Sequence, residues 1–446
     1  MKNILLFGAG KSATCLIDYL VHNAASEDWQ ISIADISTDL IESKTGKAPC
    51  TKAYATDITD AESRASLISQ ADIVISMMPP SLHILIAKDC VDQNKNLLTA
   101  SYVDPQIRGL ENEIKSKGLL FLCEMGLDPG IDHMSAMQII DGIKKDGGVI
   151  ASFKSHCGGL VAPESDDNPW HYKISWNPRN VVTAGSAGAV YRVWEEETKV
   201  GYHDIFTACE EIELDEIGTL AWYPNRDSLS YIPLYQLEEA ATFIRTTLRH
   251  PSFCRAWAVL VDLKMTDDDD AAIVSNCKTL EEWFNKKMSI TAGKAIDWEA
   301  FESLVIDEEN REEITTMFSW LGLFSSVPLP ADCNNSAAVL QKILEEKMVL
   351  QPHDKDMVVM VHEIDYVQDS QEKSIVSALV VKGENSLKTA MAKTVGLPLG
   401  IAAKLILNGT ITLTGLHIPI VKEIYLPVLA ELEANGITFE ETLPLY

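Results

Sequence analysis

The sequence predicts an α/β protein that begins with a doubly wound parallel sheet, and two patterns near its start carry this prediction. Through residue 122, six short apolar strand patterns alternate with helix patterns, which is typical of consecutive parallel βαβ units. The first strand pattern, residues 4–7, runs directly into the glycine-rich segment 8–13 and an amphipathic helix pattern. This order is that of a Rossmann domain, which we expect to cover residues 1–125.

The glycine-rich segment has the residues that a dinucleotide pyrophosphate requires. Gly8 permits the tight turn, Gly10 lets the backbone approach the phosphates at the helix N-terminus, and Ala13 takes the packing position. The second strand pattern, residues 30–34, ends in Asp35, about 25 residues after Gly10. An acid near this spacing accepts the ribose 2′-hydroxyl. The sequence therefore predicts a dinucleotide site, and the simpler alternative is a βαβ turn that binds no phosphate.

Asp35 also bears on the choice of cofactor. A carboxylate beside the ribose repels a 2′-phosphate, and residues 36–38 offer no guanidinium to bind one. We therefore expect NAD to be favoured, with NADP as the alternative. Lys44 or Lys47 would weaken this preference if either side chain folded back toward the site.

The other elements of this domain follow in order. After Asp35 we expect strands at 53–55, 73–76, 97–99 and 119–122, and helices at 61–69, 82–91 and 104–117. Ligands of doubly wound sheets lie over the carboxyl ends of the strands. The loops expected at that edge are 8–13, the loop at Asp57, 77–80, 99–103 and 124–130.

The rest of the chain is expected to form a second α/β domain from residues 126–252 and 351–399, with a mainly α-helical insertion at 253–350. The apolar spacing of residues 237–247 predicts a helix. A long helix at 386–408 is expected to break at Gly396-Leu397-Pro398, because proline lacks the N–H of a helix interior. The C-terminal helices, about 400–446, are expected to return to the first domain.

Bulk composition excludes several classes of partner. The net charge of −28 opposes a nucleic-acid surface, which needs a positive field. No run approaches the roughly 18 apolar residues of a membrane span, so no membrane is expected. The nine cysteines form no C-x-x-C pair, and the N-terminus leads straight into a strand pattern. These features predict reduced thiols and a cytoplasmic location.

Residues 126–134 combine glycine, proline and acids beyond what core packing requires. Asp128 precedes a proline, so its backbone is expected to be extended rather than helical. It either caps the helix that starts near Ile131 or contacts substrate, and both roles are compatible. His133, inside that helix, is expected to be structural.

Residues 156–172 form a second such segment. Cys157 has no sequence-adjacent base, so a buried or proton-relaying thiol is favoured over a covalent nucleophile. His156, Cys157 and His171 lack a fourth ligand at suitable spacing, and no metal site is expected.

Two arginines are the strongest candidates for binding an anionic substrate. Arg226 and Arg249 each lie near a turn-forming proline in a strongly acidic chain. A guanidinium pairs bidentately with a carboxylate, so both could hold substrate carboxylates. The alternative is a surface ion pair with a neighbouring acid such as Asp227.

Together these segments resemble the saccharopine dehydrogenase family in its glutamate-forming branch, also called saccharopine reductases, of the aminoadipate pathway of lysine metabolism. The resemblance runs through nearly the whole chain and is weakest at about 265–315. The matching segments are residues 98–102, 126–133, 157–160, 163–164, 168–169, 223–228, 247–249, 320–323, 390–398 and 422–425.

The resemblance implies an oxidoreductase. Its family oxidises the secondary amine of saccharopine with NAD or NADP and hydrolyses the imine to L-glutamate and 2-aminoadipate 6-semialdehyde. It further implies that the substrates are small molecules only. The second domain would bind substrate and would also form the interface of a homodimer.

The resemblance and the carboxyl-edge loops together assign roles to particular residues. The residues expected at the dinucleotide are Gly8, Gly10, Lys11, Ser12, Ala13, Asp35, Asp57, Met78, Thr99, Ala100 and Ser101. Those expected to contact substrate are Ser101, Tyr102, Asp128, Arg226, Thr247, Leu248 and Arg249. Asp128, Tyr102 and Cys157 are the candidates for proton transfer.

Two other functions stay open. A carboxynorspermidine- or homospermidine-type dehydrogenase would bind a more cationic polyamine and would need acids where this chain has Arg226 and Arg249. A non-catalytic NAD(P)-binding sensor would need no substrate groups in its second domain.

Overall fold

The computed structural model describes residues 1–207, 209–215 and 217–442, which form two compact units. Unit 1 comprises Met1–Ile150 and Tyr366–Tyr446, and unit 2 comprises Ala151–Asp365. The chain passes between the units within two long strands, β7 (Val149–Val161) and β14 (Asp356–Gln368).

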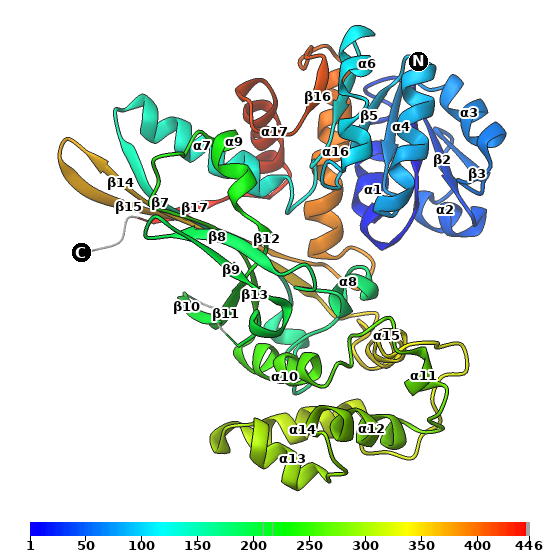
Figure 1. Cartoon of the computed structure of the whole chain (residues 1–446). Helices are drawn as coiled ribbons and strands as arrows, with labels where there is room; N and C mark the ends of the chain where they lie inside the picture. The colour runs from blue at the N-terminus through cyan, green and yellow to red at the C-terminus, as the bar shows by residue number, and fades with distance from the viewer. Residues whose placement is uncertain (208, 216, 443–446) are drawn as a thin grey trace. The chain divides into compact units, whose positions relative to one another are not determined.

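Unit 1 is built on a seven-stranded sheet in the order β16-β6-β5-β4-β1-β2-β3, drawn mainly in blue and cyan in Figure 1. Its pairings are parallel, and this confirms the predicted Rossmann fold. The central strand β1 lies between β2 and β4, so the strand order reverses at β1 and the ligand edge is defined there. The strands are β1 (Lys2–Phe7), β2 (Trp29–Asp35), β3 (Thr51–Ala55), β4 (Ile73–Ser76), β5 (Asn96–Thr99), β6 (Leu120–Leu122) and β16 (Gly415–His417).

The helices between these strands differ from the prediction in two places. Helix α2, which is largely polar, was not predicted. Ser37 caps it by accepting the Leu40 N–H, and Gly46 ends it in the left-handed region, at φ 57°. The single helix expected at 104–117 is instead two short ones, with Gly109 and Leu110 between them. The helices are α1 (Thr14–Asn23), α2 (Thr38–Thr45), α3 (Ala61–Ser69), α4 (His83–Asp92), α5 (Pro105–Arg108) and α6 (Glu111–Ser116).

Near the C-terminus, helix α16 (Ala390–Leu407) is continuous through Pro398, so the predicted break at 396–398 is wrong. The helix packs against α1, and a Cβ atom on Gly396 would lie 2.9 Å from the Leu16 nitrogen. Glycine therefore lets the two helices approach closely, and this packing offsets the roughly 3 kcal/mol that an interior proline costs. Helix α17 (Lys422–Ala434) packs on both α16 and α7 (Ile131–Lys145).

Helix α16 also corrects the expectation about apolar runs. By length and composition it would pass as a membrane span, with a mean hydropathy of 1.5 over 18 residues. However, 67% of that stretch is buried inside the structure. Its apolar composition is accounted for by its position in the core of unit 1.

The contact of α16 with α1 leads to a first prediction. Replacing Gly396 with alanine is expected to destabilise the protein by roughly 1–3 kcal/mol, because the new methyl group meets the Leu16 backbone, which cannot rotate away. Thermal denaturation would show this as a lower Tm. An unchanged or higher Tm would mean that the two helices separate at no cost.

In unit 2 the strand order is β10-β11-β13-β7-β14. The central strand β13 covers residues 242–249, so the helix predicted at 237–247 is wrong. The apolar residues there recur at helical spacing, but Thr242, Phe243 and Ile244 favour a strand, and β13 pairs on both sides, with β7 and β11. Besides β7 and β14, the strands of unit 2 are β8 (Ala189–Val193), β9 (Glu196–Val200), β10 (Glu210–Leu214), β11 (Gly218–Pro224), β12 (Arg226–Asp227) and β13 (Thr242–Arg249).

Helices α10 to α15 lie at the positions expected for a helical insertion. They do not form a separate body, because one apolar core contains residues of α10–α15 together with Ala221 and Tyr223 of β11. The division into units also differs from the expected domains at residues 126–150 and 366–399, which belong to unit 1. The helices of unit 2 are α8 (Pro178–Val182), α9 (Ile232–Tyr235), α10 (Pro251–Asp262), α11 (Ala271–Val274), α12 (Leu280–Ala292), α13 (Trp298–Val305), α14 (Arg311–Leu321) and α15 (Ser336–Lys347). Unit 1 also contains β15 (Gln371–Lys382) paired with β17 (Glu440–Thr442).

Candidate active site

The glycine loop of unit 1 has the geometry that a dinucleotide needs. Gly8 has φ +97°, and a Cβ atom there would lie 3.0 Å from the Met77 carbonyl oxygen at the end of β4. A Cβ atom on Gly10 would meet nothing within 4 Å, so this side of the loop is open to a ligand. The loop leads through Lys11–Ala13 into α1, where backbone N–H groups attract phosphate. These residues fit a bound pyrophosphate.

Two charged side chains hold this loop. The Asp35 carboxylate accepts a hydrogen bond from the Ala9 N–H at 2.7 Å. Lys44 folds back, as one alternative allowed, and its Nζ donates to the Gly10 carbonyl at 2.5 Å and to Thr14 Oγ1 at 2.9 Å. Burial lowers the pKa of Lys44 to about 8, while Asp35 favours the charged form. A cation thus lies beside the acid on which the NAD preference was based.

Three other residues predicted at the cofactor lie at the same edge of the sheet. Lys11 is exposed, Ser12 is half-buried, and Met78 packs beside the core under the β4 loop. Ala13 is fully buried, as its packing role requires. Asp57 is exposed after β3, and hydrogen bonds from the Thr59 N–H and hydroxyl hold its pKa below the usual range.

His83 also lies at the carboxyl edge of this sheet, and the sequence did not predict it as a site residue. Its Nδ1 lies 2.8 Å from Ser76 Oγ, and its Nε2 lies 2.7 Å from Ser101 Oγ and 3.2 Å from Thr99 Oγ1. The ring thereby ties the carboxyl ends of β4 and β5, and it fixes the Ser101 hydroxyl predicted to contact both ligands. Only the Pro79-Pro80 stop before α4 hinted that His83 would reach this edge.

The buried state of His83 predicts a pH dependence of stability. Burial lowers the pKa of His83 to about 4, below the 6.5 of the unfolded chain. Between pH 6.5 and 4, His83 is therefore protonated in the unfolded state but neutral in the folded state. The stability that is present above pH 6.5 is lost as the pH falls toward 4. Relative to His83→Gln, the wild type should lose on the order of 3 kcal/mol of unfolding free energy across that range.

Guanidinium denaturation of both proteins at pH 6.5, 5.5 and 4.5 would measure this difference. His250, whose pKa burial also lowers to about 4, is present in both proteins and cancels. Parallel curves for the wild type and H83Q would contradict the assignment.

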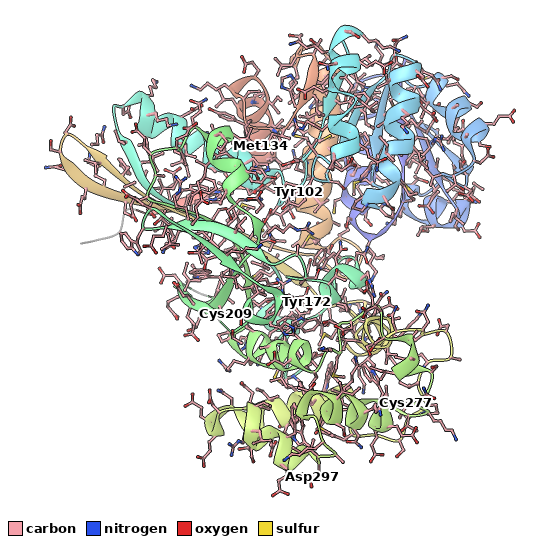
Figure 2. The ribbon with its side chains drawn as sticks, viewed as in Figure 1. Tyr102, Met134, Tyr172, Cys209, Cys277 and Asp297 are labelled. Carbon is pink, nitrogen blue, oxygen red and sulfur yellow. The ribbon has the colours of Figure 1, made fainter. Side chains whose placement is uncertain are left out.

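The loops after β5 and β6 bring Tyr102 and Asp128 together within unit 1. The Tyr102 hydroxyl donates to Asp128 Oδ1 at 3.1 Å, and Figure 2 labels Tyr102 in its loop. The N-cap residue of α7 is Gly130 rather than Asp128, which corrects one of the two expected roles of Asp128. The helix begins after Gly130, and the Gly130 N–H donates to Asp132 Oδ1 at 2.6 Å. Asp128 is therefore not needed as a helix cap.

His133 and Glu124 support these loops. Both are buried, and His133 Nε2 lies 2.9 Å from Glu124 Oε2. The other Glu124 oxygen accepts the Val103 N–H at 3.1 Å, next to Tyr102. Ala100 packs at the base of the same loops, 3.0 Å from where a Cβ atom on Gly126 would lie.

In unit 2, the strand register places three predicted residues on one face of the sheet. Thr247 of β13 pairs with Cys157 of β7 and with Tyr223 of β11, so these side chains point to the same side. Arg249, two residues along β13, shares this face. Leu248 lies on the opposite face and is fully buried; only its carbonyl contributes here, by accepting a hydrogen bond from Arg249 Nη1 at 2.7 Å.

Arg249 is a buried cation with no counter-ion among the residues that the structure describes. It is 4% exposed, and its guanidinium carbon lies 5.1 Å from the Tyr172 ring, labelled in Figure 2, and 5.7 Å from the Phe253 ring. Burial raises the pKa of Tyr223 to about 12, so this neighbour stays neutral. Within the described part of the chain Arg249 has no ion pair, and its Nε has no hydrogen-bond partner. This arrangement suits an anionic ligand.

Arg226 is placed differently from Arg249. It is exposed, has φ +53°, and pairs through β12 with Ala189 of β8. The neighbouring Asp227 accepts a hydrogen bond from the Ser230 N–H at 3.1 Å.

The opposite face of this sheet has its own polar group. His156 is fully buried, with Nδ1 2.7 Å from Thr246 Oγ1 and Nε2 3.0 Å from Glu363 Oε2. The His156 contact lowers the pKa of Glu363. Adjacent residues of a strand face opposite ways, so His156 and Cys157 point to opposite faces of the sheet.

The fold and these two groups of residues define a dinucleotide-binding α/β protein with a buried cationic position in its second unit. The chain belongs to the saccharopine dehydrogenase family. Residues 4–122 match the saccharopine dehydrogenase NADP binding domain, and residues 126–437 match the saccharopine dehydrogenase C-terminal domain. These matches confirm the resemblance inferred from the sequence.

Individual relatives agree with this assignment. The chain is 36% identical to the saccharopine dehydrogenase [NADP(+), L-glutamate-forming] of Saccharomyces cerevisiae, over 99% of both chains. It is 33% identical to the mitochondrial alpha-aminoadipic semialdehyde synthase of Bos taurus, over 98% of this chain but 47% of the relative. An apo structure of the Saccharomyces cerevisiae saccharopine dehydrogenase (L-Glu forming) aligns with a TM-score of 0.89 at 34% identity, covering 100% of both chains. The yeast relative's name specifies NADP(+), which gives the predicted NAD preference no support.

Proposed function

We propose that this chain is an L-glutamate-forming saccharopine dehydrogenase that uses a nicotinamide dinucleotide. The observation that carries the proposal is Arg249, a buried guanidinium with no counter-ion in the described chain. Saccharopine has three carboxylates, so a protein with a net charge of −28 must reserve cations for it. A polyamine substrate would repel this cation, and this disfavours the polyamine-type alternative.

The reaction requires hydride transfer, orientation of the substrate and proton transfer, and different residues are suited to these tasks. When bound, the dinucleotide supplies an acceptor for the hydride that leaves the carbon attached to the secondary amine. The amine must be neutral for this step, and it loses its proton as the carbon–nitrogen double bond forms. Arg249 and Thr247 orient the substrate through its carboxylates and exclude other orientations of the bound substrate.

Hydrolysis follows the oxidation. Water adds to the imine carbon and loses a proton while the nitrogen gains one, which gives a carbinolamine. The carbinolamine hydroxyl then loses a second proton and the nitrogen gains a second as the carbon–nitrogen bond breaks, which releases L-glutamate and 2-aminoadipate 6-semialdehyde. The Tyr102–Asp128 pair is suited to hold and move these protons, because a carboxylate accepts a proton while the hydroxyl fixes its position. Cys157 is the third candidate. Since the substrate nitrogen does part of this work, each single truncation should slow the reaction modestly.

For the cofactor, Asp35 supports NAD, whereas Lys44 reduces the repulsion of a 2′-phosphate. We propose NAD as the preferred cofactor, with NADP accepted. The cytoplasmic location and the homodimer remain predictions.

Absorbance at 340 nm with saccharopine and NAD or NADP, in separate cuvettes, tests the proposal. Reduction of either dinucleotide together with glutamate formation supports it, and faster reduction of NAD supports the preference. Silence with both, in protein that binds a dinucleotide, would overturn the proposed reaction.

A further inference from the structure

We propose that Lys44 determines how far this site discriminates between NAD and NADP, by holding the glycine loop and balancing the charge of Asp35. The inference deepens the proposed function and rests on it for the use of a nicotinamide dinucleotide. It assigns Lys44 as a positioning and specificity-determining residue.

The contacts show that Lys44 acts on the loop itself. Asp35, at the end of β2, holds the Ala9 N–H at 2.7 Å, and Lys44, from the last turn of α2, holds the Gly10 carbonyl at 2.5 Å. Two adjacent residues of the phosphate loop are thus fixed by opposite charges from two successive elements. The bond from Lys44 to Thr14 Oγ1, at 2.9 Å, ties the same ammonium to the first residue of α1.

Burying the Lys44 ammonium costs free energy of hydration, and this cost is offset only where the charge interacts with another group. Burial disfavours the charged form of Lys44 and lowers its pKa to about 8. A methionine could fill the same space without losing hydration, because its side chain has similar length and no charge. Lys47, three residues later, avoids this cost, since it is exposed and pairs with Glu42 at 2.8 Å. Lys44 therefore differs from an ordinary surface lysine such as Lys47.

The electrostatic consequence depends on the ribose substituent. A ribose hydroxyl is neutral and is bound by Asp35 alone, so Lys44 affects it only through loop geometry. A 2′-phosphate carries nearly two negative charges above pH 7, and beside Asp35 it is repelled. The Lys44 ammonium offsets that repulsion. Removing the Lys44 ammonium should therefore weaken the binding of NADP more than the binding of NAD.

The charged groups that act on Lys44 come from two elements. Asp35 on β2 and Asp18 on α1 favour its protonated form, whereas the Cys15 thiol, whose pKa burial raises to about 11, is uncharged between pH 7 and 9. As the pH rises from 7 to 9, Lys44 loses its proton while the 2′-phosphate stays ionised. Affinity for NADPH should therefore fall over this range more than affinity for NADH.

The test is a fluorescence titration of the full chain with NADPH and with NADH, without saccharopine, for the wild type, K44M and K47M. For K44M we expect NADPH binding to weaken roughly tenfold and NADH binding less than threefold. K47M makes the same change in net charge at a nearby exposed position, and it should alter neither. The loss of NADPH affinity between pH 7 and 9 should be present in the wild type and K47M but absent from K44M.

The outcomes separate this inference from the proposed reaction. Equal losses for both dinucleotides in K44M would overturn the specificity role and leave a structural one, as would a pH profile like that of the wild type. Identical affinities in K44M and K47M would overturn both roles of Lys44. Since the titration contains no saccharopine, a chain that binds dinucleotide but oxidises no saccharopine would overturn the proposed function alone.

Discussion

Replacing Arg249 with methionine is expected to lower kcat/KM for saccharopine by roughly 100-fold and, at the same time, to leave the protein as stable or more stable. The loss of activity follows because a substrate carboxylate would lose its buried, charge-assisted partner. A truncated partner of this kind costs about 2–5 kcal/mol, and each 1.4 kcal/mol is a factor of ten.

The opposite sign for stability follows from the environment of Arg249. Among the described residues its Nε has no hydrogen-bond partner, and its neighbour Tyr223 is neutral. The compensation for its burial is one hydrogen bond to the Leu248 carbonyl and cation–π contacts with Tyr172 and Phe253. In the absence of substrate, folding therefore removes this cation from water without an ion pair in return. Methionine keeps the packing volume and avoids that cost. A structural arginine would give the reverse result, because its removal would lower the Tm.

Arg255→Met is the matched control. Arg255 also belongs to unit 2, but it is half-exposed and pairs with Glu313 at 2.9 Å. Its loss should lower the Tm slightly and leave kcat/KM unchanged. Steady-state kinetics with saccharopine and thermal denaturation of R249M and R255M would measure both effects. If R249M had a lower Tm and normal kcat/KM, Arg249 would be a structural residue.

The first unit could be predicted because its signals are local. The strands and most of the helices of residues 1–122 carry their own periodicity, the polar helix α2 excepted, and the glycine turn specifies the strand and helix beside it. The seventh strand, β16, could not be found in this way, since it has three residues and joins β6 from almost 300 residues away. For β13, local spacing indicated a helix, and tertiary pairing with β7 and β11 decided otherwise.

The candidate site shows the same division. Residues that follow strand ends, such as Asp35 and Ser101, were predictable because parallel strands place their carboxyl ends at one edge. His83 was not predicted, and Lys44 was named only as an alternative beside Lys47, because their contacts depend on how a helix packs against a neighbouring loop. Leu248 could not be separated from Arg249 until the segment was known to be a strand, in which adjacent side chains face opposite ways.

The largest loss of stability is expected for Gly130→Ala, in the loop that holds Asp128. Gly130 has φ +148°, a conformation that side chains rarely adopt. A Cβ atom there would lie 2.5 Å from the carbonyl carbon of Gly126 and closer still to its nitrogen and oxygen. These are backbone atoms, fixed by bonds from the Gly126 N–H to the Pro129 carbonyl and from the Ile131 N–H to the Gly126 carbonyl. Strain and overpacking together should cost about 4 kcal/mol.

Two further glycines near this loop turn the prediction into a ranking, which holds even if G130A does not fold. Gly142 is exposed in the last turn of α7, and a Cβ atom there meets nothing within 4 Å, so alanine should stabilise the helix by about 0.5–1 kcal/mol. Gly126→Ala should be intermediate, because its Cβ atom would lie 3.0 Å from the Ala100 Cβ and 3.2 Å from the Pro129 oxygen. Thermal denaturation should therefore give Tm values that decrease in the order G142A, wild type, G126A, G130A. We expect G130A to yield little soluble protein. A G130A variant as stable as the wild type would mean that the loop can hold Asp128 in a different backbone conformation.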